Sequence, residues 1–106
     1  MELKLIKKIQ QKGFRTRRIY EINFYKVEET DFGDGKPVVN VYIDNGIVPF
    51  LPTIETVYDF NDESITDFKI NPAAYGSLSC EDIELMINSL NIAIETAKTL
   101  IKKYVK

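Results

Sequence analysis

The chain contains no histidine and only one cysteine, Cys80. The absence of histidine excludes a Ser-His or Cys-His nucleophile pair and every imidazole-ligated metal site. One cysteine cannot build a thiolate zinc cage or an internal disulfide. The chemistry left to the side chains is that of carboxylates, lysine, tyrosine and one thiol, so we expect no cofactor, no metal and no enzymatic activity.

Long hydrophobic runs are also missing from the sequence. The longest uncharged stretch, Ile70–Cys80, is interrupted by Asn71, Pro72 and Gly76, whereas a helix that spans a bilayer needs about 20 apolar residues. The first eight residues alternate charged and apolar side chains, which is unlike a secretory signal peptide. The lone cysteine agrees with a reducing compartment. These features predict a cytoplasmic protein.

Length and composition favour one folded unit. The chain has 106 residues, of which 44% are hydrophobic and 28% are charged. This balance is typical of globular proteins and too apolar for a disordered one. The sequence shows no internal repeat and no linker, and we therefore expect a single α+β domain over residues 1–106.

The first half of the chain predicts strands of an antiparallel meander. Apolar residues alternate with polar ones over Arg17–Glu28, which predicts one strand. The glycine-containing turn Phe32–Gly35 follows, and the alternation resumes over Val39–Ile43, so this region indicates a hairpin. Residues 2–12 fit either a strand or a short helix that ends at Gly13, and we favour the helix.

The middle of the chain completes a meander of four or five strands. Asp44, Asn45 and Gly46 predict another turn. The prolines in 47–52 lack the backbone N–H of a central strand, which makes this segment an edge strand or a crossing loop. Two further short strands are expected at 54–60 and 65–70.

A long helix from Cys80 to Val105 is the clearest predicted element. Ser79 can cap its N-terminus, acidic residues follow in the first turn, and lysines crowd its end. Apolar residues recur at spacings of four and three, which predicts one broad face packed on the meander. These residues are Ile83, Ile87, Leu90, Ile94, Ala97, Ile101 and Tyr104, with Met86, Ala93 and Leu100 beside them.

Leu85 and Ile92 fall nearly opposite that face and are predicted to point away from the sheet. Single apolar residues on a surface are normal, and the N-terminal segment is one candidate cover for these two. The alternative is a contact with a target protein or with a second copy of the chain, which makes a homodimer a candidate assembly.

Charge is distributed unevenly, although the net charge is only −2. Residues 1–18 contain seven Lys or Arg and one Glu, whereas residues 37–97 contain ten acidic residues and one lysine. The conservative interpretation is that the basic start lies against the acidic hairpin of the same chain. The functional one is that the acidic centre attracts a basic partner.

We favour the second interpretation, a non-enzymatic protein-interaction module whose acidic surface docks on a basic protein. By analogy, phage-type inhibitors of nucleic-acid enzymes act in this way. The expected contacts lie on the second hairpin and at the start of the long helix, and we expect them to form one negative surface. They are Glu55, Asp59, Asp62, Glu63, Asp67, Glu81, Asp82 and Glu84.

Two other functions stay open. The first is a nucleic-acid-binding accessory protein, in which Phe14 and Tyr20 stack on bases beside a basic strip. The second is a metal-dependent nuclease, in which Asp59, Asp67 and Lys69 hold Mg²⁺ and position a water molecule. The basic strip consists of Lys7, Lys8, Lys12, Arg15, Arg17 and Arg18.

Overall fold

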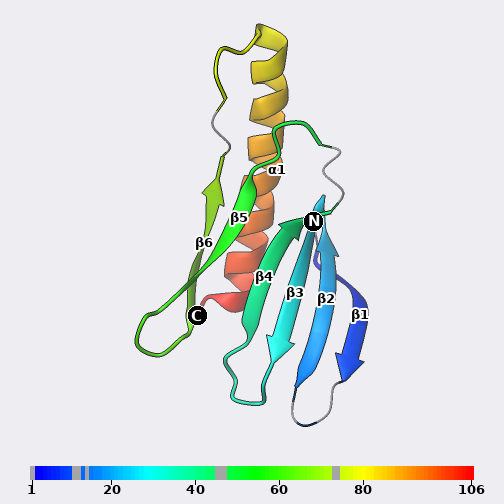
Figure 1. The fold of residues 1–106 in the computed structure, drawn as a ribbon, viewed down its shortest axis with the longest axis vertical. Coiled ribbons are helices and arrows are strands. Elements are labelled where there is room, and N and C mark those ends of the chain that lie inside the picture. The colour runs from blue at the N-terminus through cyan, green and yellow to red at the C-terminus, as the bar shows by residue number, and fades with distance from the viewer. Residues whose placement is uncertain (1, 11–12, 14, 45–47, 73–74) are drawn as a thin grey trace.

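The computed structural model describes residues 2–10, 13, 15–44, 48–72 and 75–106 and has an α+β fold (Figure 1). Four strands form one antiparallel sheet, two more form a separate hairpin, and one long helix packs on the strands. The strands are β1 (Lys4–Gln10), β2 (Thr16–Ile22), β3 (Tyr25–Asp31), β4 (Val38–Ile43), β5 (Thr53–Tyr58) and β6 (Ile65–Asn71), and the helix is α1 (Cys80–Tyr104).

The prediction of an N-terminal helix is wrong, because residues 4–10 form strand β1, which pairs with β2. Leu5 lies opposite Tyr20, and the register shifts between Leu5 and Lys7 at an irregularity in the strand. The spacing of Leu3, Ile6 and Ile9 fits a helix, but pairing with β2 satisfies the backbone groups of the segment instead. This is a case in which tertiary context overrides a weak local pattern.

The strand expected over Arg17–Glu28 is in fact two strands joined by a tight turn. Ile22 pairs with Tyr25, and Asn23 and Phe24 form the turn between them. Asn23 has a φ of 53°, a conformation that asparagine tolerates better than most residues. In one continuous strand, Tyr25 would point away from the face that carries Ile22. The turn breaks this alternation, and Tyr25 is fully buried.

The predicted hairpin around Phe32–Gly35 is confirmed as the β3–β4 connection. The Asp31 Oδ1 atom accepts the Gly33 N–H at 2.8 Å, and the Asp34 Oδ1 atom accepts the Lys36 N–H at 2.9 Å. Gly33 and Gly35 both have positive φ. The turn is therefore held by local side-chain bonds to its own backbone.

The hairpin β5–β6 is predicted correctly, but it does not extend the first sheet. No described strand pairs with β4 on its outer edge; the Tyr58 and Thr56 hydroxyl groups bridge the gap instead. The Val39 N–H donates to the Tyr58 hydroxyl oxygen at 2.9 Å, and the Thr56 hydroxyl donates to the Val39 carbonyl at 2.8 Å. Of the segment 47–52, residues 48–52 form a crossing connection, and Ile47 lies outside the described residues, as do Asn45 and Gly46 of the predicted turn.

The helix begins as predicted, since the Ser79 side chain accepts the Asp82 N–H at 3.1 Å. Its buried face is only partly the predicted one: Ala93, Ala97 and Leu100 are buried and Ile101 and Tyr104 pack against the core, as predicted, but the rest of the face is rotated. The buried row consists of Ser89, Ala93, Thr96, Ala97 and Leu100, whereas Ile83, Ile87 and Ile94 are exposed.

Small side chains explain this rotation of the buried face. Ser89 and Thr96 allow the helix to approach other segments closely, and both form hydrogen bonds there. The Ser89 hydroxyl donates to the Pro49 carbonyl at 2.6 Å, and the Asn23 amide donates to the Thr96 hydroxyl oxygen at 2.6 Å. The remaining core comes from the four-stranded sheet, the β5–β6 hairpin and Leu51 of the crossing connection. Its strand residues include Ile22, Val27, Val39, Val41, Ile54, Ile65 and Phe68.

Candidate functional site

The turn between β5 and β6, residues Asp59–Ser64, is the most distinctive surface feature. The Asp59 N–H donates to the Ser64 carbonyl at 2.7 Å, which closes the turn. The Asp59 Oδ1 atom accepts the N–H groups of Asn61 at 2.8 Å and Asp62 at 3.1 Å. The backbone of the turn is thus held by a carboxylate within it, and we call Asp59–Ser64 the acidic turn.

A second carboxylate closes the other side of the acidic turn. The Asp62 Oδ1 atom accepts both the Ser64 N–H at 2.9 Å and the Ser64 hydroxyl at 2.6 Å. These hydrogen bonds lower the pKa of the Asp62 carboxyl, with a smaller contribution from the charge of Lys36. Asp62 therefore carries its negative charge at neutral pH while fully exposed to solvent.

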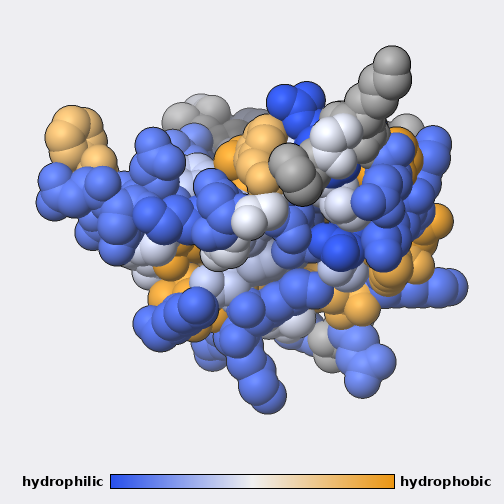
Figure 2. Space-filling model, turned by 90° about the horizontal axis from the view of Figure 1, so that it is seen from below, coloured by the Kyte–Doolittle hydropathy of each residue, from blue (hydrophilic) through white to orange (hydrophobic). Residues whose placement is uncertain are grey.

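Phe60 stands in the middle of these charged residues and is 98% exposed. Among the exposed large hydrophobic residues that the structure describes, it has the greatest exposure. In the view from below, an apolar side chain projects from the hydrophilic end of the molecule where the β5–β6 hairpin lies (Figure 2). A fully exposed aromatic ring makes no contribution to the core of this chain.

Phe60 was not anticipated from the sequence, because the pattern placed it at the end of a strand. The available signal is its position between Asp59 and Asn61, since an aromatic residue inside a polar turn has no neighbour to pack on. The structure ends β5 at Tyr58 and leaves Phe60 in the turn.

The eight predicted acidic contacts do not form one surface. Asp59, Asp62 and Glu63 gather in the acidic turn, at the lower end of the molecule in Figure 1, whereas α1 begins at the upper end. The first-turn residues Glu81, Asp82 and Glu84 therefore belong to a different region. The expectation of a single acidic face is wrong because β6 carries the chain from the acidic turn to the other end of the molecule before α1 begins.

The other two predicted acidic contacts lie along the hairpin. Glu55 is exposed on β5, directly opposite Lys69 on β6. Asp67 is half-buried, and its carboxylate accepts the Phe68 N–H at 2.8 Å. Asp59, Asp67 and Lys69, the predicted nuclease residues, lie in this hairpin as well, and no group of three or more His, Cys, Asp or Glu placed to hold a metal occurs among the described residues.

Beside the acidic turn lies a groove of about 860 Å³ between the hairpin and the end of α1. Asp62 and Glu63 line one side, and Lys103 and Tyr104 line the other. Burial raises the pKa of Tyr104 far above its usual value, and the nearby Glu29 charge raises it further. The groove thus has mixed charge, in contrast to the acidic turn at its rim.

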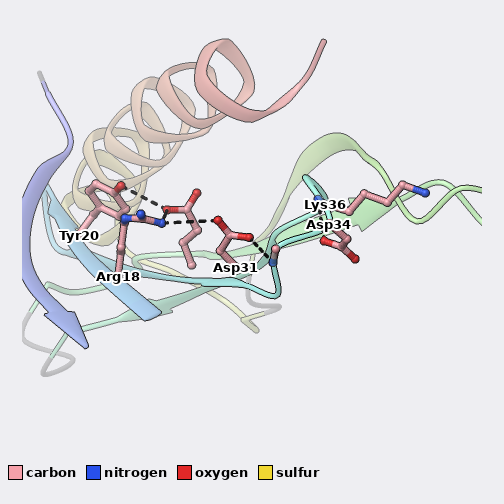
Figure 3. A network of polar contacts seen from close by, with 7 residues as sticks. Arg18, Tyr20, Asp31, Asp34 and Lys36 are labelled. Carbon is pink, nitrogen blue, oxygen red and sulfur yellow. Dashed lines mark hydrogen bonds and ion pairs between the residues drawn. The ribbon is translucent and has the colours of Figure 1, made fainter. Parts of the chain in front are cut away.

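The predicted basic strip is divided between the two faces of β2. Arg17 approaches Glu28 with an Nε–Oε1 distance of 3.3 Å, which is an ion pair between neighbouring strands. Arg18 lies on the other face, 3.9 Å from Glu29 and 4.0 Å from Asp31 (Figure 3). Arg17 and Arg18 therefore pair with carboxylates of β3. The conservative interpretation of the sequence expected the basic start to lie against the acidic second hairpin instead.

The rest of the strip and its stacking residues are scattered. Lys7 and Lys8 are exposed on β1, and Arg15 lies 4.9 Å from the centre of the Phe32 ring. Lys12 and Phe14 lie outside the described residues. Tyr20 donates to Glu29 at 3.2 Å, and the Lys103 ammonium lies 3.9 Å from the centre of its ring.

The predicted apolar pair does not form one exposed patch. Leu85 is exposed, as expected, whereas Ile92 is partly buried and packs against the core. Its burial follows from the rotation of α1 described above.

No family model, curated protein or solved structure matches this chain. Among the described residues, no helix is long and apolar enough to cross a membrane.

Proposed function

We propose that this protein is a non-enzymatic interaction module that docks on a basic partner protein through the acidic turn. The observation that carries the proposal is Phe60, a fully exposed aromatic ring at the centre of a turn with three carboxylates. Aromatic residues are enriched among the anchors that dominate binding energy in protein interfaces. The fitting partner has an apolar pocket for the ring and a rim of Lys or Arg around it.

The hydrogen bonds of the turn support this proposal on energetic grounds. Asp59 and Asp62 hold the backbone on both sides of Phe60 before any partner arrives. A preorganised loop loses less conformational entropy on binding, so the affinity of the complex is higher. The carboxylates also attract a basic surface over distances of about 8–10 Å at physiological salt, which favours the on-rate of the complex.

The experiment is an affinity capture from cell lysate with the wild-type protein and two variants, at low and moderate salt and after nuclease treatment. Phe60→Ala removes the anchor, and Phe24→Ala is the matched control, because Phe24 is an exposed aromatic residue of another turn. We expect a partner protein that the wild type and Phe24→Ala retain after nuclease treatment and that Phe60→Ala does not retain. Its capture should weaken as the salt concentration rises.

A charge variant separates the anchor from the electrostatic attraction. Glu63→Lys reverses one charge at the turn, while Asp59 and Asp62, which hold the backbone, stay unchanged. We expect weaker capture of the same protein and a smaller dependence on salt. Equal capture by the wild type and by Phe60→Ala would contradict the proposal, and nuclease-sensitive capture would favour the basic strip on nucleic acid.

A further inference from the structure

An apolar stripe along α1 has no partner among the described residues. Ile83, Ile87 and Ile94 are 46%, 52% and 40% exposed, and half-buried Leu90 lies between them. Their spacings of four, three and four place them on one side of the helix, in the pattern of a coiled-coil seam. We call these four residues the open stripe.

The open stripe lies beside the packed face of α1 and not on it. The packed row runs through Ala93, Ala97 and Leu100, and near its end Tyr104 meets Phe68 of β6 with ring centres 5.9 Å apart. In Figure 1 the first half of α1 rises beyond the ends of the strands, where connections rather than strands flank it. No described strand is therefore placed to cover Ile83 and Ile87.

Charged residues along one edge of the open stripe indicate what covers it. Glu84 and Lys98 are both exposed, lie two heptads apart on the same edge, and have the neutral Asn91 midway between them. A second copy of α1 running antiparallel brings Glu84 of each copy towards Lys98 of the other, twice by symmetry. Parallel pairing would instead bring the two acidic helix starts together, and the two lysine-rich ends likewise.

We propose that the open stripe is the interface of a symmetric homodimer in which two α1 helices pair antiparallel about an axis near Leu90. Ile87 and Ile94 of the two copies bury one another, and the Glu84–Lys98 pairs select the antiparallel orientation. This interface lies on α1, away from the acidic turn, so it is independent of the proposed function. A Phe60→Ala variant accordingly dimerises as the wild type does.

The first test measures mass by sedimentation equilibrium over a range of protein concentrations. We expect a wild-type dimer, and Ile87→Glu should weaken dimerisation at least about tenfold, because it buries a charge without a partner. Leu85→Glu is the matched control, since Leu85 is exposed on the same helix but lies off the stripe. A wild-type monomer at every concentration, or equal effects of the two variants, would overturn the proposal.

The second test uses charge reversal to fix the orientation. Glu84→Lys and Lys98→Glu should each weaken the homodimer, because each places like charges together at both ends of the seam. An equimolar mixture of the two variants should form a heterodimer, since opposite charges then meet again. Asn88→Lys, an exposed position off the stripe, should leave the wild-type dimer unchanged.

The mixing experiment also distinguishes a lost interface from a lost fold. A misfolded variant would not recover on mixing, whereas a folded monomer would. If both variants keep the circular dichroism spectrum of the wild type and the mixture stays monomeric, the antiparallel interface is wrong.

Discussion

Two turns between paired strands, the Asn23–Phe24 turn and the acidic turn, are held by opposite means. Asn23 is tied across the molecule to Thr96 on α1, at an amide-to-hydroxyl distance of 2.6 Å. The acidic turn is held by Asp59 and Asp62, whose side-chain hydrogen bonds to described residues all lie within the turn. The first turn is therefore part of the packed core. The second is held by hydrogen bonds between its own residues, and its Phe60 side chain is exposed to solvent.

This contrast separates residues that stabilise the fold from residues that are available for binding. A turn that depends on distant contacts cannot change its sequence without a cost in stability. A turn that is self-supporting can carry an exposed side chain such as Phe60 at little cost to the core. Substitutions at the two turns should therefore have very different effects on the free energy of unfolding.

The largest effect on stability is expected for Asn23→Ala. The variant loses the hydrogen bond to Thr96 and places alanine at a φ of 53°, which together cost roughly 2–3 kcal/mol. Urea unfolding measures the loss. Asn23→Gly allows the same backbone conformation and should lose only the stability that comes from the hydrogen bond. Equal losses of unfolding free energy in the two variants would show that the positive φ of Asn23 carries no cost for alanine.

A smaller loss is expected for Tyr25→Phe, beside the same turn. The buried Tyr25 hydroxyl donates to the Pro52 carbonyl at 2.5 Å, and its removal leaves that carbonyl unpaired at a cost of about 1–2 kcal/mol. Tyr104→Phe is the control, because the buried Tyr104 hydroxyl has no hydrogen-bond partner in the described part of the chain. Thermal unfolding should show a lower midpoint for Tyr25→Phe and an unchanged or higher midpoint for Tyr104→Phe.

A dependence on pH is expected at the acidic turn. The folded-state pKa of Asp62 lies below its unfolded value, so the carboxylate stabilises the turn above the unfolded pKa. That contribution is lost as the pH falls through the folded pKa. An NMR titration of the Asp62 carboxyl carbon should give a pKa below that of an unstructured aspartate, and Ser64→Ala should move it back towards that value.

The smallest effect on stability is expected for Phe60→Ala. Because the ring is 98% exposed, its removal should change the free energy of unfolding by less than about 0.5 kcal/mol. Chemical unfolding of this variant and of Phe24→Ala compares the two turns directly. A clear loss of stability in Phe60→Ala would mean that the ring packs on this chain, and the contrast between the turns would fail.

Much of the fold could be predicted because its signals are local. The Ser79 cap, the glycine turn after β3 and the polar turn after β5 each satisfy backbone groups with side chains two or three residues away. The acidic residues of the second hairpin were also identified as a candidate site. Phe60 could not be predicted as part of that site, because its exposure depends on where strand β5 ends.

By itself, the sequence determined the α+β class, the long capped helix, and the self-supporting turns that carry glycine or aspartate, because these depend on bonds between near neighbours. Only the tertiary structure decided that residues 4–10 form a strand, since their hydrogen-bond partners lie on β2. It also decided which side of α1 is buried. Apolar periodicity marks two adjoining stripes on this helix, and the choice between them follows from the close approach that Ser89, Ala93 and Thr96 permit.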